Sequence, residues 1–248
     1  LALLPTGDLT ERFLDQLPFR LTPAQARVVA DIRQDLSQPI PMLRLVQGDV
    51  GSGKTVVAAM AALQAMAAGA QVALMAPTEI LAEQHYHNFR QWLEPLGLEM
   101  VWLSGKVKGK ARTEALARLA GGQARLVIGT HALFQDDVSF DRLGLVIVDE
   151  QHRFGVHQRL ALRDKGAQGQ LAPHQLIMTA TPIPRTLAMS AYADLDTSVI
   201  DELPPGRKPI ETLVIQDQRR DEVIERVRKA CLTGRQAYWV CTLIEESE

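Results

Sequence analysis

The sequence predicts an α/β protein in which helices cover both faces of a parallel β-sheet. Short apolar runs alternate along the chain with amphipathic stretches, a pattern typical of sheets buried on both sides. A glycine-rich turn follows the first apolar run and leads into an alanine-rich helix. Strands are expected at 42–47, 72–76, 100–103, 126–129, 145–148 and 175–179, and helical patterns cover 9–36, 55–68, 79–93 and 113–119.

The helical pattern within 9–36 contains a marked start at Thr22. Threonine is a favoured N-cap residue, and the following Pro23 suits the first helical position. Val29 and Ile32 then contribute to an apolar face.

Segment 203–209 is the best candidate for a linker, because its sequence LPPGRKP cannot continue a helix or a central strand. Beyond it, 211–215 and 236–241 have the pattern of strands, and 219–233 that of a helix. We therefore expect one domain over residues 1–205, then a linker and the truncated start of a second α/β lobe over residues 206–248.

Composition sets few limits on function. The 248 residues are 46% hydrophobic and 23% charged, which is typical of a globular protein with a sizeable core. A net charge of -2 neither favours nor excludes a nucleic-acid partner, since a local basic surface is enough for such contact.

No apolar run reaches the ~18 residues of a membrane span. Cys231 and Cys241 offer no zinc-binding set, and an intracellular protein is expected.

Residues 48–55 match the phosphate-binding pattern G-x-x-x-x-G-K-[ST] in full, between a predicted strand and a predicted helix. Glycines let main-chain amides approach phosphates, and the helix N-terminus adds positive potential. Lys54 is expected to contact the β- and γ-phosphates, and Thr55 to ligate Mg²⁺. The predicted ATP-binding residues of this loop are Gly48, Asp49, Val50, Gly51, Ser52, Gly53, Lys54 and Thr55.

Two carboxylates, Asp149 and Glu150, follow the aliphatic run 145–148. A buried strand places them at its carboxyl end, where sheets of this kind bind ligands. We expect Asp149 to hold Mg²⁺ and Glu150 to orient and deprotonate the attacking water. Together with Lys54 they form the predicted catalytic set of an ATP hydrolase.

Asp149-Glu150-Gln151-His152 resembles motif II of the superfamily 2 helicases, and segments 179–182, 76–79 and 129–131 resemble their motifs III, Ia and Ib. The resemblance implies a RecA-like P-loop NTPase fold followed by the start of a second RecA-like lobe. It also implies coupling residues at Gln151, His152, Thr179 and Thr181, and nucleic-acid contacts at Pro77, Thr78, Gly129, Thr130 and His131.

Gln25 and Phe19 resemble the adenine-reading Q motif of the same helicases. A side-chain amide can pair with the adenine edge, and an aromatic ring can stack on the base.

A closer resemblance, carried by segments 103–112, 151–159, 179–186 and 238–248, is to the bacterial RecG and Mfd group, with the RecG branch favoured. It implies an ATP- and Mg²⁺-dependent helicase that translocates on double-stranded DNA. Such an enzyme remodels stalled forks, Holliday junctions and R-loops in recombination and repair. A monomer in the bacterial cytoplasm, associated with the nucleoid and not with a membrane, is expected. Arg153 is assigned to nucleic acid, although it could equally pair with local acids.

We expect these residues to be a piece of a longer protein of that group, without its wedge domain and with its second motor lobe cut near the first strand. We therefore expect the chain alone to bind nucleotide weakly and to hydrolyse it poorly. Two alternatives stay open: an Mfd-like translocase that acts on stalled RNA polymerase, and a module that binds nucleotide without turnover. An RNA helicase is less favoured, since the commonest RNA class has Asp-Glu-Ala-Asp at this motif.

Other polar residues carry weaker signals. The basic cluster Lys106, Lys108, Lys110 and Arg112 fits either a solvated loop or a phosphate contact. The histidines lack metal-binding spacing, and surface or capping roles are expected for His85, His87, His157 and His174.

Overall fold

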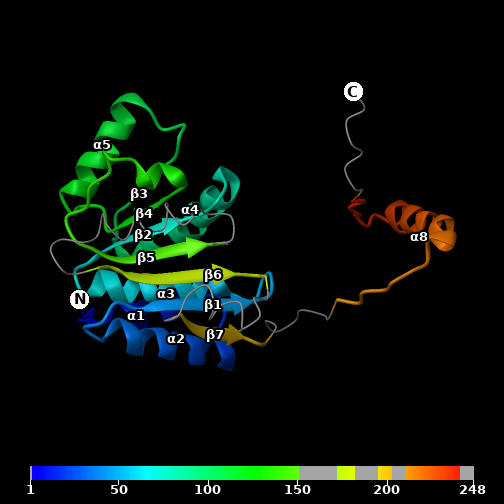
Figure 1. Ribbon diagram of the computed structural model, residues 1–248, viewed down its shortest axis with the longest axis horizontal. Helices are drawn as coiled ribbons and strands as arrows, with labels where there is room; N and C mark the ends of the chain where they lie inside the picture. The colour runs from blue at the N-terminus through cyan, green and yellow to red at the C-terminus, as the bar shows by residue number, and fades with distance from the viewer. Residues whose placement is uncertain (1, 151–171, 182–194, 203–209, 241–248) are drawn as a thin grey trace. The chain divides into compact units, whose positions relative to one another are not determined.

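The computed structural model describes residues 2–150, 172–181, 195–202 and 210–240 (Figure 1). The chain divides into two compact units, Leu1–Pro205 and Gly206–Glu248. The first unit contains a seven-stranded sheet in which every described pairing is parallel. The predicted α/β fold class is therefore confirmed.

The strand order is β3-β4-β2-β5-β6-β1-β7, so β6 lies between β1 and the central strand β5 (Figure 1). This order brings together strands that lie far apart in the sequence, because β6 pairs with Leu43–Gly48 on one side and Leu143–Asp149 on the other. The strands are β1 Leu43–Gly48, β2 Gln71–Met75, β3 Met100–Leu103, β4 Leu126–Gly129, β5 Leu143–Asp149, β6 His174–Thr179 and β7 Asp196–Ile200.

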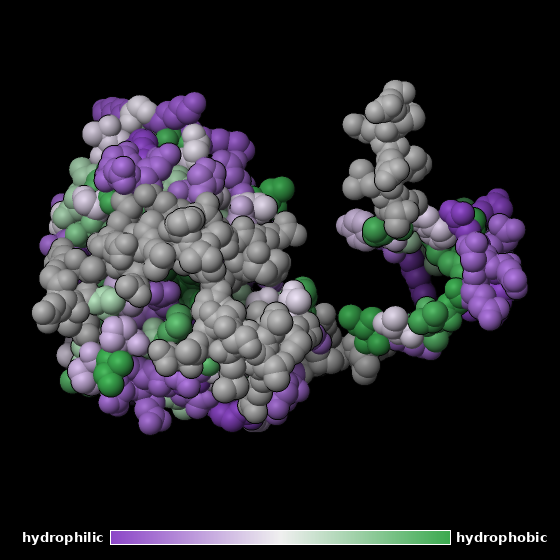
Figure 2. Space-filling view, viewed as in Figure 1, coloured by the Kyte–Doolittle hydropathy of each residue, from purple (hydrophilic) through white to green (hydrophobic). Residues whose placement is uncertain are grey.

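Helices pack on both faces of the sheet. One core cluster joins α1, α2, α3 and α4 to alternate residues of the strands. The opposite strand residues pack against α5 and the segment that follows β4. Hydrophilic residues gather on the outer surfaces of α5 and α2, at the top and bottom of the first unit (Figure 2). Among the described residues of this unit, the α-helices are α1 Leu9–Gln16, α2 Pro23–Leu36, α3 Lys54–Ala67, α4 Glu79–Leu93 and α5 Gly109–Ala120, with short 3-10 turns η1 Glu94–Leu96 and η2 His131–Phe134.

The segment 9–36, predicted to be helical in pattern, forms two helices, α1 and α2, with a break between them. Leu17 leaves helical geometry, with ψ 135, because the following Pro18 disfavours the helical conformation in the residue before it. The second helix begins where the sequence indicates, since Thr22 and Gln25 form a capping box and Pro23 occupies the first turn. The predicted helix at 113–119 begins earlier than expected, at Gly109.

Strand β7 was not predicted. Its sequence, Asp-Thr-Ser-Val-Ile, is mostly polar, and it lies at the edge of the sheet with alternating burial. Pairing with β1 and burial of Ser198 and Ile200 hold it there. A short edge strand with one buried face carries too few apolar residues to be recognised from the sequence.

The second unit contains the 3-10 turn η4 Asp217–Arg219 and the helix α8 Arg220–Leu232, close to the predicted helix. The predicted strand at 211–215 is wrong, and 236–240 is not a strand either; residue 241 lies outside the described residues. A strand requires a paired neighbour, and none is described in this unit. Its apolar side chains are exposed instead (Figure 2), among them Val214 at 99% and Tyr238 at 96%.

No helix among the described residues is both long enough and apolar enough to cross a membrane. Cys231 is exposed on α8 with a free thiol, and Cys241 lies outside the described residues.

Gly129 has a structural role that explains why glycine stands at the end of β4. A Cβ atom there would lie 1.9 Å from the main-chain oxygen of Leu103 on β3. We expect Gly129→Ala to lower the free energy of unfolding by about 1–3 kcal/mol, because two backbones must separate. Urea unfolding measures this. Gly105→Ala is the control, since no atom lies within 4 Å of its Cβ position; equal losses in the two variants would contradict the prediction.

Candidate nucleotide-binding and coupling site

The predicted functional segments meet at one edge of the sheet. Because all the strands are parallel, the carboxyl ends of β1, β4, β5 and β6 lie at the same edge. The phosphate loop follows β1, the acidic pair ends β5, and the Thr-Ala-Thr segment follows β6. A single strand, β6, thus lies between the strand that precedes the loop and the strand that ends in the acidic pair.

The phosphate loop turns through left-handed glycines, Gly51 with φ 80 and Gly53 with φ 90. Lys54 begins α3 and bends back, its Nζ donating to the carbonyl oxygens of Gly48 at 2.6 Å and Asp49 at 3.0 Å. Two main-chain oxygens therefore hold the ammonium group inside the loop, where phosphate oxygens are expected to lie.

Burial lowers the pKa of Lys54 below its ordinary value, while the negative charges of Asp149, Glu150 and Asp49 act in the opposite direction. The lysine and the acidic pair therefore lie close enough for their charges to interact, with β6 between the strands that carry them.

Gln25 connects the N-terminus of α2 to the phosphate loop. Its Oε1 accepts from the main-chain nitrogen of Thr22 at 2.9 Å, and its Nε2 donates to the carbonyl oxygen of Ser52 at 2.8 Å. A Cβ on Gly53 would lie 2.2 Å from this Nε2. Glycine at this position therefore allows both the left-handed turn and the close approach of the amide.

A cavity of about 960 Å³ lies beside the loop, large enough for a purine base and ribose. Phe19 and Gln25, the two residues predicted to read adenine, both line it, together with Thr55 and Trp92. Phe19 is 45% exposed, so its ring is available for stacking. The amide of Gln25 is already bonded within the protein, so it shapes the pocket and supports the loop as well.

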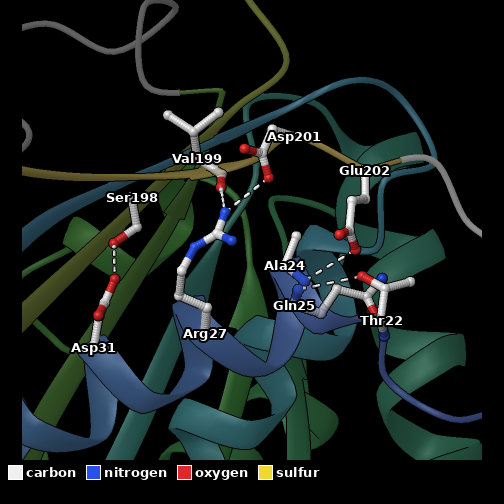
Figure 3. A network of polar contacts seen from close by, with 9 residues as sticks. All are labelled: Thr22, Ala24, Gln25, Arg27, Asp31, Ser198, Val199, Asp201 and Glu202. Atoms are coloured by element: carbon white, nitrogen blue, oxygen red, sulfur yellow. Dashed lines mark hydrogen bonds and ion pairs between the residues drawn. The ribbon is translucent and has the colours of Figure 1, made fainter.

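Contacts between α2 and the end of β7 hold this pocket (Figure 3). Glu202 lines the cavity, and its Oε2 accepts from the main-chain nitrogen of Ala24 at 3.0 Å. Farther along the helix, Arg27 pairs with Asp201 at 2.7 Å and lowers the pKa of that carboxyl group. Sequence reasoning missed Glu202, because no motif marks it and β7 itself was not predicted.

The acidic pair is held by the neighbouring strand. Glu150 has φ 50, an uncommon left-handed value for a non-glycine residue, and its main-chain nitrogen donates to Met178 at 2.9 Å. Its Oε1 accepts from the nitrogen of Ala180 at 3.0 Å and its Oε2 from Thr179 Oγ1 at 3.1 Å. Thr179 Oγ1 accepts in turn from the nitrogen of Thr181 at 3.1 Å. The carboxylate is therefore bonded directly to the Thr-Ala-Thr segment.

His85 lies on α4 and contacts Asp149, its Nε2 being 2.7 Å from Oδ2. A surface or capping role was expected for this histidine, and that expectation is wrong, since the residue is 7% exposed. The signal was present in the sequence: His85 follows Ala82 by three residues and precedes Phe89 by four, the spacing of a buried helical stripe.

His174 is also buried, at 0% exposure, and its Nδ1 accepts from the main-chain nitrogen of Met42. The expected surface role is wrong here too, because the residue is buried and its ring accepts from a main-chain amide just before β1. His87 is exposed, as expected.

The residues expected to contact nucleic acid are placed unequally. Thr78 is exposed and caps α4, accepting from the nitrogen of Leu81, and Pro77 beside it is half-buried. After β4, Thr130 is buried at 2% exposure whereas His131 is exposed.

Acidic neighbours pair with most of the basic cluster. Lys106 pairs with Glu79, Lys110 with Glu114, and Arg112 with Asp137, so three of its four cations already have acidic partners.

Gln151, His152, Arg153 and His157 lie outside the described residues. The described residues contain no group of three or more His, Cys, Asp or Glu side chains that could hold a metal. Thr55 and Asp149 provide a hydroxyl and a carboxylate, the hard oxygen donors that Mg²⁺ prefers when nucleotide phosphates and water complete its shell. These residues therefore fit a magnesium ion that arrives with its nucleotide.

The site combines a phosphate-binding loop with an acidic pair at one sheet edge, and comparison with protein families identifies the class to which it belongs. The model of DEAD/DEAH box helicases matches residues 22–190, which include the phosphate loop, the acidic pair and the Thr-Ala-Thr segment. The chain therefore belongs to the DEAD/DEAH box helicase family.

Within that family the chain is similar to RecG. It is 68% identical over 241 residues to the ATP-dependent DNA helicase RecG of Escherichia coli O157:H7, and 69% identical over 242 residues to that of Pasteurella multocida (strain Pm70). Each alignment covers 97% of this chain and 35% of the relative, so the chain spans about a third of those proteins. A solved structure of RecG bound to a three-way DNA junction superimposes with a TM-score of 0.81 at 44% identity, covering 93% of this chain and 30% of that one.

Lys54→Met tests the nucleotide site. The wild-type chain should gain about 2.7 kcal/mol of stability from MgATP at one hundred times its dissociation constant. We expect the variant to gain less than about 0.5 kcal/mol at the same concentration, because the phosphates lose their ammonium partner. Without nucleotide, the variant should unfold at the same or a higher temperature, since a cation with a burial-lowered pKa destabilises the folded state.

Thermal unfolding with and without MgATP measures both effects. Lys110→Met is the control, because its side chain is 90% exposed. Equal stabilisation of the Lys54 variant and the control by MgATP would contradict the assignment of the loop.

Proposed function

We propose that this chain is the first motor lobe of an ATP-dependent translocase that remodels branched double-stranded DNA. The observation that carries the proposal is the bonding of Glu150 to Thr179 and Ala180. It connects the carboxylate expected to position water with the segment expected to report on nucleic acid. A protein that only binds nucleotide has no need of such a connection.

The names of the similar proteins support the choice of DNA. The relatives are bacterial ATP-dependent DNA helicases, and the similar structure holds a three-way DNA junction. Because the chain spans about a third of these proteins, we infer that a second motor lobe and a branch-recognising wedge domain would complete the enzyme. Action as a monomer in the bacterial cytoplasm, at the nucleoid, belongs to the same proposal.

In the proposed reaction, the main-chain amides of the loop and the Lys54 ammonium bind the triphosphate. Phe19 stacks on adenine, and Gln25 connects the phosphate loop to the wall of the adenine pocket through its bonds to Ser52 and Thr22. Glu150 orients the attacking water and accepts its proton. Thr55 and Asp149 would hold Mg²⁺, which neutralises charge on the phosphates during transfer.

The proposed DNA track passes the exposed ends of two connections after β2 and β4. Thr78 at the start of α4 and His131 after β4 have the exposure that a phosphate contact requires. Pro77, Gly129 and Thr130 shape the same two connections. Arg153 is proposed to contact the same nucleic acid, and Gln151 and His152 to couple it to the ATP site.

Glu150→Gln tests hydrolysis in the full-length protein. We expect ATP still to bind but turnover to fall by about a hundredfold or more, because the amide cannot accept the proton of water. Trapped ATP and loss of phosphate release, with and without a three-way junction, are the measurements. An unchanged nucleotide lifetime would favour a pure binding module. Wild-type stimulation by RNA polymerase, and not by branched DNA alone, would favour the Mfd-like alternative.

Thr179→Val tests the connection between the two segments. Valine keeps the volume of this side chain, which is 1% exposed, but removes the hydroxyl that donates to Glu150 and accepts from Thr181. We expect kcat for DNA-stimulated ATP hydrolysis to fall about tenfold to a hundredfold while KM for ATP changes little. Thr197→Val on β7 is the control. A change in KM with kcat unaltered would count against coupling.

A further inference from the structure

A histidine on the helix that follows the Pro77–Thr78 connection is bonded to the predicted metal-binding carboxylate. The Nε2 of His85 and the Oδ2 of Asp149 are 2.7 Å apart, and their side chains are 9% and 12% exposed. The carboxylate is an acceptor, so the ring N–H donates. Because the contact is buried, it is stronger than the same contact in water.

The bond fixes one of the two oxygens of Asp149. With Oδ2 occupied by the ring, the carboxylate can turn little, and Oδ1 is left for a metal ion or its water shell. Carboxylates and histidines that bind metals are commonly held by such outer partners, whose loss weakens binding. Nδ1 of the same ring is buried and has no hydrogen-bond partner among the described residues. Asp149 is thus the polar partner that orients the ring.

The position of His85 on α4 gives the contact a second consequence. The helix begins at Glu79, is capped by Thr78, and carries His85 six residues later, roughly 9 Å along its axis. Phe89 and Leu93 anchor the same helix in the main core. A shift at the exposed start of a packed helix would therefore move the ring against Asp149.

We propose that His85 is a positioning residue that orients Asp149 toward Mg²⁺ and connects that carboxylate to the start of α4. The connection to DNA rests on the proposed function, whereas the orientation of Asp149 does not. Two measurements therefore separate the parts of the proposal.

The first measurement uses this chain without DNA. The Mg²⁺ concentration needed for half-maximal ATP binding, followed with a fluorescent ATP analogue, should rise about tenfold in His85→Leu. His85→Gln should restore most of the loss, because its amide nitrogen reaches about as far as Nε2. ATP binding measured without Mg²⁺ should be the same in all three proteins. His87→Leu is the matched control, since this histidine lies on the same helix with its side chain 64% exposed.

Urea unfolding without nucleotide shows whether the substitution also lowers the free energy of unfolding. If His85→Leu merely loosens the core, ATP binding without Mg²⁺ will weaken as well, and glutamine will give no selective rescue. That result, or equal Mg²⁺ requirements in the wild type and His85→Leu, would overturn the proposal.

The second measurement uses the full-length protein with a three-way junction. At saturating Mg²⁺, the ratio of DNA-stimulated to basal ATP hydrolysis should fall at least fivefold in His85→Leu and recover in His85→Gln. An unchanged ratio would overturn the connection to α4. If the wild type shows no stimulation by DNA, the proposed function fails. The orientation of Asp149 is then still decided by the Mg²⁺ measurement, which uses no DNA.

Discussion

The pairing of β6 between β1 and β5 is the constraint on which the site depends. Neighbouring strands lie about 4.8 Å apart, so one intervening strand sets the phosphate loop and the acidic pair roughly 10 Å from each other. A triphosphate with its metal ion fits that separation. The registers are fixed by buried aliphatic side chains, since a slip by one residue would turn them to the opposite face. The core therefore determines where catalytic groups lie.

The position of β6 beside β5 also fixes the conformation of one catalytic candidate, Glu150. Its left-handed backbone costs on the order of 1–3 kcal/mol, and such strain persists only when the surroundings enforce it. The bonds to Met178, Thr179 and Ala180 supply that enforcement from β6 and the residues after it. The conformation turns the carboxylate toward the Thr-Ala-Thr segment. Strain, water positioning and coupling therefore depend on the same few contacts.

Much of this could be predicted from the sequence, for identifiable reasons. Strands buried on both faces have uninterrupted apolar runs, and the glycine and lysine spacing of the loop is dictated by phosphate geometry. The edge strand β7 lacked such a run, so Glu202 was missed with it. The burial of His85 was indicated by its helical spacing, but its partner Asp149 could not be identified because it lies 64 residues away in sequence. Contacts across that distance follow from strand order, and local patterns do not specify strand order.

Lys54 illustrates why the site must change when nucleotide binds. Its ammonium group is bonded to the oxygens of Gly48 and Asp49, and these bonds must yield if it is to reach the β- and γ-phosphates. A bond to a charged phosphate oxygen is stronger than one to a neutral carbonyl, so the exchange favours binding. Gln25 is bonded to Thr22 and Ser52 independently of Lys54, and Gly53 leaves room for its amide. The glycine thus allows one wall of the loop to stay fixed while the lysine moves, which limits the ordering cost of binding.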